Sequence, residues 1–143
     1  MKGKILVIGA NGQIGTALLP RLEEIYGEGN IVASDINAPV NSIGPFEHLD
    51  ATKADDLATI VRKHGITQIY HLAAILSARG EADPVWAWNI NMQTLLTVLE
   101  ASREFKLDKV FIPSSIAVFG PSSGKIMTQQ NACLEPSTVY GVS

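Results

Sequence analysis

The chain has 143 residues, of which 46% are hydrophobic and 17% charged, and its formal net charge is −3 at pH 7. This length suits one domain with a buried core, and the composition excludes a disordered segment. A slightly acidic chain offers no basic surface for nucleic acid, and no apolar run is long enough to span a membrane. Because it has one cysteine, Cys133, and its first apolar run is too short for a secretion signal, we expect a cytoplasmic protein.

Short apolar runs alternate with segments of helical periodicity along the chain. In chain order, the sequence predicts strands at Lys4–Gly9, Asn30–Asp35, Phe46–Asp50, Gln68–Ala74 and Lys109–Ser115. It predicts helices over about Gly12–Tyr26, over Ala54–His64, and along a longer segment that contains Ile90 and Leu99. Strands that alternate with helices pair in parallel, so we expect an α/β fold with a sheet covered on both faces. Residues 120–137 are rich in Pro, Ser, Gly and Gln and are predicted to form a long loop.

The motif GANGQIG follows the first predicted strand and opens the first predicted helix. Gly9 would let the chain turn sharply, Gly12 would let a diphosphate approach the backbone, and Gly15 would let the helix pack against the sheet. The amides at the helix start, around Gln13 and Ile14, would then attract the anion. An ordinary tight turn is the alternative, but the position between strand and helix favours a phosphate site in a Rossmann-type, doubly wound parallel sheet.

Two carboxylates follow predicted strands. Asp35 lies twenty residues after Gly15, where it could accept hydrogen bonds from the ribose diol of an adenosine. A 2′-phosphate would meet that negative charge, and residues 36–38 supply no arginine, so NAD is favoured over NADP. Asp50 could reach the adenine amino group or could simply cap the helix that follows, and the two interpretations are equally supported.

Residues 113–120, PSSIAVFG, and Tyr140 could supply the chemistry of an alcohol oxidation, which needs a base for the hydroxyl proton. A tyrosine acts as a base only if its pKa falls well below about 10, which requires a nearby cation. A lysine four residues further along a helix would supply one, since positions i and i+4 share a face. A serine at the end of the fifth strand could hydrogen-bond the reacting oxygen.

These motifs resemble the extended branch of the short-chain dehydrogenases/reductases. That branch carries a glycine turn, a strand end like HLAA (His71–Ala74), a strand end like SSIAVFG (Ser114–Gly120), and Tyr-x-x-x-Lys, of which YGVS (Tyr140–Ser143) is the start. Within the branch, the chain is similar over essentially its whole length to the short-chain family of NAD-dependent L-threonine 3-dehydrogenases. The most specific parts are LSARGE in residues 76–81 and the proline after VFG.

The resemblance implies NAD-dependent oxidation of the L-threonine 3-hydroxyl to 2-amino-3-oxobutyrate. It makes Tyr140 the general base, Ser115 the hydroxyl that orients the substrate oxygen, and Ser77 a residue on the substrate side. Many relatives have threonine at the Ser115 position, which keeps the hydroxyl. The positions that match the family's cofactor site are Gly9, Gly12, Gln13, Ile14, Gly15, Asp35, Asp50, Ala51, Leu72, Ala73, Ala74 and Tyr140. The three histidines have no metal-ligand spacing, so no metal site is expected.

The family's lysine would be residue 144. By resemblance we therefore expect residues 1–143 to be the incomplete NAD-binding domain of a longer enzyme, lacking the last sheet strands and a smaller substrate domain, with little turnover alone. The resemblance also implies a homodimer built on the long helix, and a structural role for Asn91 in bonding backbone near the neighbouring strand. Two alternatives stay open, a sugar-nucleotide epimerase or dehydratase of the same branch and a non-catalytic NAD-binding module.

Overall fold

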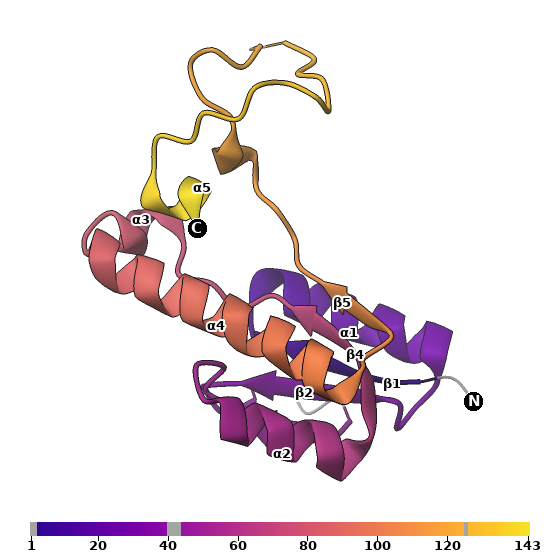
Figure 1. Cartoon of the computed structure of the whole chain (residues 1–143). Helices are drawn as coiled ribbons and strands as arrows, with labels where there is room; N and C mark the ends of the chain where they lie inside the picture. The colour runs from indigo at the N-terminus through magenta and orange to yellow at the C-terminus, as the bar shows by residue number, and fades with distance from the viewer. Residues whose placement is uncertain (1–2, 40–43, 125) are drawn as a thin grey trace. The chain divides into compact units, whose positions relative to one another are not determined.

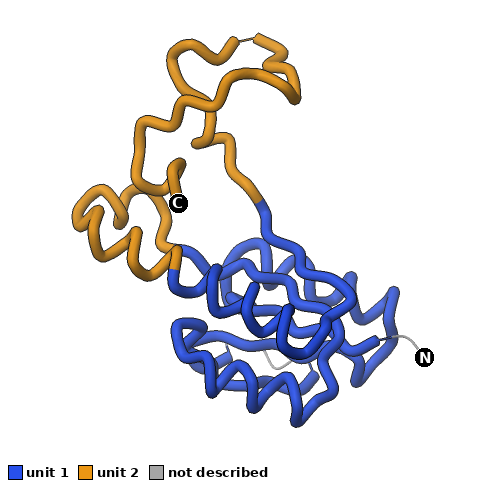
Figure 2. Tube along the Cα trace, in the orientation of Figure 1, with its two compact units in different colours: residues 1–74, 93–113 blue, residues 75–92, 114–143 orange. Residues whose placement is uncertain are grey.

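The structure is a computed structural model and describes residues 3–39, 44–124 and 126–143. Its elements in chain order are β1 (Lys4–Ile8), α1 (Gln13–Tyr26), β2 (Ile31–Asp35), β3 (Phe46–His48), α2 (Ala54–His64), β4 (Ile66–His71), α3 (Ser77–Gly80), α4 (Pro84–Phe105), β5 (Lys109–Phe111), the 3-10 turn η1 (Ile116–Val118) and α5 (Val139–Val142) (Figure 1). The chain divides into two compact units (Figure 2). Unit 1 comprises residues 1–74 and 93–113, and unit 2 comprises residues 75–92 and 114–143.

Unit 1 contains a five-stranded parallel sheet in the order β3-β2-β1-β4-β5. β1 lies at its centre, where Ile5 pairs with Ile31 of β2 on one side and with Gln68 of β4 on the other. The chain runs outward from β1 through β2 to β3, and then crosses to the other side of β1 to form β4 and β5. The strand order therefore reverses between β1 and β4, and in such sheets ligands bind beyond the carboxyl ends of the strands at that point.

Helices cover both faces of this sheet. On one face, α1 packs Leu19 and Leu22 against β1 and β2. On the other face, α2 contributes Leu57 and α4 contributes Val98 to a second apolar cluster. The apolar residues 5–8 of β1 are at most 1% exposed, since a strand at the centre of a covered parallel sheet is buried on both sides. The predicted fold, a Rossmann-type doubly wound α/β sheet, is confirmed.

The strand predicted at Gln68–Ala74 is shifted toward the N-terminus, to Ile66–His71. It begins early because Gly65, in the left-handed conformation with φ of 63°, ends α2 and turns the chain directly into the strand. It ends at His71 because its partner β1 turns away at Gly9. The sequence pattern marked the apolar run but not where the neighbouring strand stops.

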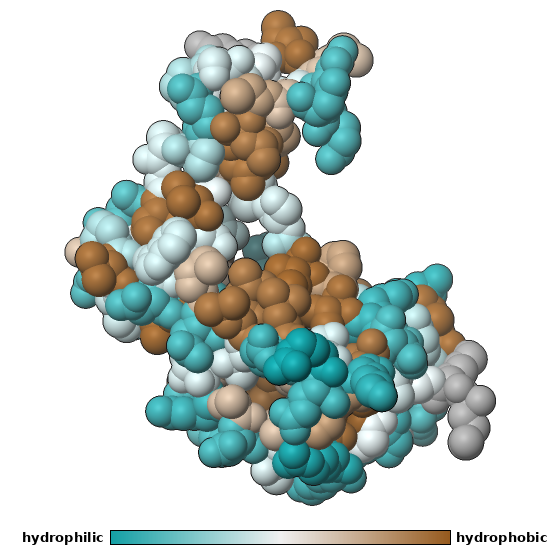
Figure 3. Space-filling view, in the orientation of Figure 1, coloured by the Kyte–Doolittle hydropathy of each residue, from teal (hydrophilic) through white to brown (hydrophobic). Residues whose placement is uncertain are grey.

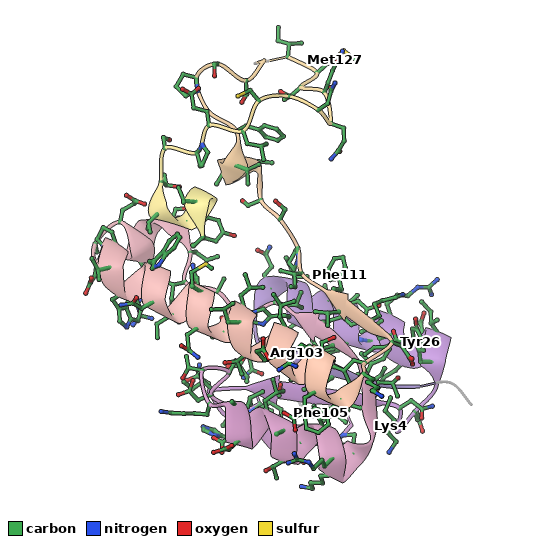
Figure 4. The ribbon with its side chains drawn as sticks, in the orientation of Figure 1. Lys4, Tyr26, Arg103, Phe105, Phe111 and Met127 are labelled. Carbon is green, nitrogen blue, oxygen red and sulfur yellow. The ribbon has the colours of Figure 1, made fainter. Side chains whose placement is uncertain are left out.

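The third and fifth predicted strands are shorter than expected. β3 ends at His48 rather than Asp50, and β5 ends at Phe111 rather than Ser115. Pro113, two residues beyond β5, has no amide hydrogen to donate to a strand ladder. Phe111, labelled in Figure 4, is 45% exposed. Its ring centroid lies 5.3 Å from that of Tyr70 on β4.

Unit 2 includes α3, the first part of α4, η1, α5 and the predicted loop. Of residues 120–137, those that the structure describes form neither helix nor strand, as expected. The base of this loop is closed tightly, because a Cβ on Gly120 would lie 1.8 Å from the carbonyl oxygen of Glu135. Ser123 is 5% exposed, and its hydroxyl donates to the Cys133 carbonyl at 2.7 Å. Across the described ranges of the chain, no helix is both long and apolar enough to cross a membrane.

Candidate functional site

The glycine turn joins β1 to α1 at the carboxyl edge of the sheet, where the strand order reverses. Gly9 has a φ of 83°, and a Cβ there would lie 2.7 Å from the amide nitrogen of Ala73, so another residue would be strained and would collide with the segment after β4. A Cβ on Gly15 would lie 2.5 Å from the carbonyl oxygen of Ala10. Glycine is therefore what lets α1 begin so close to the turn. Gly9 makes a sharp turn, as predicted, whereas the close neighbours of Gly15 are the backbone atoms of Gly9 and Ala10 in the turn itself.

Gly12 differs from these two glycines, because the space beside it is nearly open. A Cβ there would meet a single neighbouring atom among those described, the Gly9 carbonyl oxygen at 3.3 Å. Gly12 caps α1 without a side chain, and the first turn of α1 carries no acidic residue. The amides of Gln13, Ile14 and Gly15 therefore have no carbonyl partner within the helix and no cap side chain to bind. An open backbone with unpaired helix-start amides fits a diphosphate group.

Asp35 ends β2 and is held against the glycine turn. Its Oδ2 accepts a hydrogen bond from the Asn11 amide at 3.1 Å, and its Oδ1 accepts one from the Asn37 amide at 3.0 Å. The residue is only 9% exposed. Its Oδ1 also accepts a hydrogen bond from the Asn37 Nδ2 at 3.4 Å. A carboxylate offers about four acceptor positions, so one position, on Oδ2, remains for a ribose hydroxyl beside the turn.

Asn11 is a residue of this site that the sequence analysis missed. Its side-chain Nδ2 donates to the carbonyl oxygens of Asn37 and Ala38, at 3.2 and 3.0 Å. These bonds hold the segment that follows Asp35 against the glycine turn. The signal in the sequence was weak. Asn11 lies inside a turn whose conformation the glycines already accounted for, so its side chain was given no role.

Asp50 is engaged by its own following turn. Its Oδ1 accepts hydrogen bonds from the Thr52 hydroxyl at 2.7 Å and from the Thr52 amide at 3.0 Å. The Thr52 hydroxyl, followed by the Thr52 amide, holds the pKa of the Asp50 carboxyl below its ordinary value. The carboxylate thus caps the turn before α2, whose own N-cap is Lys53. Ala51 beside it is buried, and contact of this pair with an adenine stays a prediction.

The segment Leu72–Ala74 continues from β4 beside the glycine turn. The Leu72 amide donates to the Ile8 carbonyl at 2.8 Å, so the segment still follows β1 after the strand ends. Leu72 and Ala73 pack against the apolar clusters on opposite faces of the sheet, and Ala74 is exposed. His71, just before this segment, is 5% exposed, and burial lowers its pKa to about 4.

The other three predicted site residues lie in unit 2. Ser77 is the first residue of α3, Ser115 immediately precedes η1, and Tyr140 lies in α5, and each is partly buried. The elements that carry them pack on one another. A Cβ on Gly141 of α5 would lie 2.2 Å from the carbonyl oxygen of Ala117 in η1, so glycine lets these two elements approach closely.

Ser115 has the hydrogen-bond arrangement expected of a hydroxyl that can serve a ligand. Its Oγ accepts from the Ala117 amide at 3.2 Å. Since a hydroxyl has one hydrogen and two acceptor positions, that bond leaves its hydrogen to donate elsewhere. Ser114, the neighbour that could be mistaken for it, is exposed.

Asn91 of α4 has the structural role expected of it. Its Oδ1 accepts from the Ile75 amide at 2.8 Å, and its Nδ2 donates to the Ile75 carbonyl at 3.2 Å. The backbone that it bonds follows β4 by four residues rather than lying in the strand. Its Nδ2 also donates to the Ser143 hydroxyl at 3.0 Å, which connects α4 to the end of α5.

Comparison with known proteins gives a consistent set of relatives. Residues 5–143 match the model of the NAD dependent epimerase/dehydratase family. An uncharacterized epimerase/dehydratase of Staphylococcus aureus is 44% identical over 145 residues, which cover 98% of this chain and 44% of that protein.

Among solved structures, a partial consensus L-threonine 3-dehydrogenase is 54% identical with a TM-score of 0.93, covering 97% of this chain and 45% of that one. The holo form of a GalE-like L-threonine dehydrogenase from Cupriavidus necator is 51% identical with a TM-score of 0.94, covering 97% of this chain and 46% of that one. The chain therefore spans less than half the length of the relatives that it matches. The family model matches residues 5–143, and the sheet with its glycine turn is the fold expected for that family. The chain belongs to the NAD-dependent epimerase/dehydratase family, in the extended branch of the short-chain dehydrogenases/reductases.

Proposed function

We propose that the full-length protein carrying this chain is an NAD-dependent dehydrogenase that oxidises the 3-hydroxyl of L-threonine to 2-amino-3-oxobutyrate. The observation that carries the proposal is the similarity to the two threonine dehydrogenases, at 54% and 51% identity over nearly the whole chain. In this proposal residues 1–143 form the incomplete NAD-binding domain, and the last strands and a smaller substrate domain come from the rest of the protein. The protein acts in the cytoplasm.

NAD suits the residues at the edge of the sheet in unit 1. The amides of residues 12–15 would hold its diphosphate, Asp35 would accept from the adenosine ribose, and Asp50 with Ala51 would meet the adenine. Leu72–Ala74 would border the nicotinamide ribose, which Tyr140 would also contact. When bound, the oxidised cofactor supplies the acceptor for the hydride that leaves C3 of the substrate.

The residues of unit 2 carry the proton in this proposal. Tyr140 takes the hydroxyl proton onto its phenolate oxygen as the C3–O bond becomes a carbonyl. Ser115 donates a hydrogen bond to the substrate oxygen on C3. The Ala117 amide donates to the Ser115 Oγ and holds it in place. Ser77 binds the substrate from α3. The partner cation expected for Tyr140 is the lysine of the family's Tyr-x-x-x-Lys motif, beyond Ser143.

Replacing Tyr140 with Phe in the full-length protein tests this role. We expect threonine-dependent NADH formation, followed by absorbance, to fall by about 100-fold or more, since a positioned base contributes about 10²–10⁴-fold. The dissociation constant for NAD⁺ should stay largely unchanged because the diphosphate is held elsewhere. Tyr26→Phe, which changes a tyrosine of α1 outside the site, is the matched control. Equal turnover in Tyr140→Phe would remove this residue from the mechanism.

A sugar-nucleotide epimerase or dehydratase is the second candidate, because the family description and the Staphylococcus aureus relative both carry those names. Such an enzyme would convert a nucleotide sugar without net formation of NADH. Assaying the full-length protein with threonine and with nucleotide sugars separates the two enzymes. NAD⁺ binding with neither turnover would instead indicate a non-catalytic NAD-binding module.

We also propose that the protein is a homodimer that uses the outer face of α4. Leu96 and Leu99 are three residues apart on this helix and are 52% and 43% exposed. Apolar surface gathers beside the middle of α4 in the space-filling view (Figure 3). Large apolar side chains that gather on a surface are typical of a protein–protein contact, and the family resemblance points to a second copy of the chain.

A further inference from the structure

The motif LSARGE (Leu76–Glu81) ends on a residue to which the proposed chemistry gives no role. Glu81 directly follows α3, the helix that begins with Ser77. Its Oε1 accepts a hydrogen bond from the amide of Val139, 2.8 Å away and 58 residues later in the chain. Val139 begins α5, the helix that contains Tyr140. The carboxylate therefore connects the helix carrying the substrate-side serine to the helix carrying the tyrosine.

The bond satisfies a group that the helix itself leaves without a partner. The first amides of an α-helix have no carbonyl to bind within the helix. In α5, Glu81 accepts from the first of these amides, and the Thr138 hydroxyl oxygen accepts from the third, that of Gly141, at 3.0 Å. Thr138 belongs to the same segment as α5, so Glu81 is the cap that comes from another element.

A second contact lies directly beside this bond. Gly80 of α3 is buried. A Cβ there would lie 3.3 Å from Cγ1 of Val139 and 3.4 Å from Cβ of Ala87 in α4. α3 and α5 thus pack against each other through Gly80 and Val139. A packing contact alone would allow α5 to rotate about the contact point. The hydrogen bond from the Val139 amide to Glu81 fixes the orientation of α5 relative to α3.

We propose that Glu81 is a positioning residue for Tyr140, acting as a hydrogen-bond acceptor that fixes α5 to α3. The proposal rests on the proposed role of Tyr140 as the base. Through this bond, α3 with Ser77 and α5 with Tyr140 keep one arrangement, so the residue that binds the substrate and the residue that accepts its proton stay correctly placed relative to each other. The role requires an oxygen acceptor at this position and does not require its negative charge.

The test compares Glu81→Ala with Glu81→Gln, which keeps the Oε1 acceptor and removes the charge. In the full-length protein we expect Glu81→Ala to lower kcat for threonine by about tenfold or more, because a misplacement of about 1 Å can cost about 100-fold. Glu81→Gln should retain most of kcat and the pH profile of the unmodified protein. Both variants should leave the dissociation constant for NAD⁺ largely unchanged, because the proposed contacts to its diphosphate and adenosine come from unit 1. This constant therefore serves as the check on correct folding.

A readout that needs no activity is amide hydrogen exchange at Val139 in the 143-residue chain. Loss of a helix cap costs about 1 kcal/mol, so exchange should become about fivefold faster in Glu81→Ala and stay unchanged in Glu81→Gln. Glu135→Ala is the matched control, because Glu135 also accepts from a backbone amide of unit 2, that of Ser122 at 2.9 Å. It should leave Val139 exchange and kcat unaltered.

Three results would overturn the positioning role. They are unchanged exchange in Glu81→Ala, unchanged kcat in Glu81→Ala, or a Glu81→Gln variant as slow as Glu81→Ala, which would make the charge the active feature. A full-length protein that never oxidises threonine, together with faster exchange in Glu81→Ala, would overturn the proposed function and leave the connection between α3 and α5 supported.

Discussion

Asp35 and Asn11 show how two side chains join the parts of the proposed nucleotide site. Asp35 binds backbone amides on both sides of it, and Asn11 holds the carbonyls of the residues that follow. The position of Asp35 was predictable, because it depends on a fixed spacing from the glycine turn. The role of Asn11 was not predictable, because its partners lie 26 and 27 residues away and only the folded sheet brings them near.

The charge of Asp35 should determine the choice between NAD⁺ and NADP⁺. In the unmodified protein the dissociation constant for NADP⁺ should exceed that for NAD⁺. We expect Asp35→Ala to reduce the ratio of the NADP⁺ constant to the NAD⁺ constant by about tenfold, since one charge-assisted contact is worth about 1.5–3 kcal/mol. Asn11→Ala provides the matched comparison, because it removes the connection to Asn37 and keeps the carboxylate. It should weaken the binding of both cofactors while keeping the ratio. Both constants are measurable by calorimetry, and unchanged discrimination in Asp35→Ala would refute the assignment.

At the scale of elements, α4 shows what periodicity can and cannot predict. The sequence predicted a long helix here, and the helix is present. Its buried positions, however, include polar residues such as Thr94 and Thr97, whereas Leu96 and Leu99 lie outside. The apolar pattern therefore identified the helix without identifying its inner face. α2, by contrast, has the predicted bounds Ala54–His64, because Gly65 ends it locally.

The exposed leucines of α4 give a test of the proposed dimer. We expect Leu96→Glu to convert a dimer of the full-length protein into a monomer, because a charge in an apolar contact must be desolvated without a partner. Thr59→Glu places the same charge on an exposed position of α2 and should leave the dimer intact. Light scattering after size exclusion reports the mass of each. A monomeric unmodified protein, or a dimeric Leu96→Glu variant, would contradict the proposal.

Viewed as a whole molecule, the chain was predictable in class and much less so in its connections. Alternating strands and helices predicted the covered parallel sheet, and the glycine motif marked the edge of the sheet at which cofactor binding is proposed. The lengths of β3 and β5 depended on pairing with neighbours, which no local pattern encodes. The packing of α3, η1 and α5 in unit 2 depends on glycines at which another element approaches closely, such as Gly141. The sequence shows where such a glycine is, but it does not show which element packs against it.

His71 should make the stability of the folded chain depend on pH. Burial lowers its pKa from 6.5 to about 4. An unfolded chain binds a proton at His71 below pH 6.5, and the folded chain does not until about pH 4. The stability that comes from the neutral ring is therefore fully present above pH 6.5 and is lost as the pH falls to 4, by at most about 3.4 kcal/mol.

Urea unfolding at pH 7 and pH 5 measures this loss. In His71→Gln the fall in the free energy of unfolding between these two values should be smaller than in the unmodified chain, because the substituted residue does not titrate. His48→Gln, at an exposed position on β3, should behave as the unmodified chain does. An equal fall in His71→Gln and in the unmodified chain would assign the pH dependence to other groups.

The central place of β1 has a consequence for how the protein is made. Ile5 can pair with Ile31 soon after both leave the ribosome, but its other partner is Gln68, which is synthesised much later. Until then one edge of the first strand is open and its apolar side chains are only partly covered. At about 5–20 residues per second, this interval lasts several seconds in a living cell, long enough for a chaperone to engage the nascent chain. Slower translation between β2 and β4 would prolong that exposure and lower the yield of folded protein.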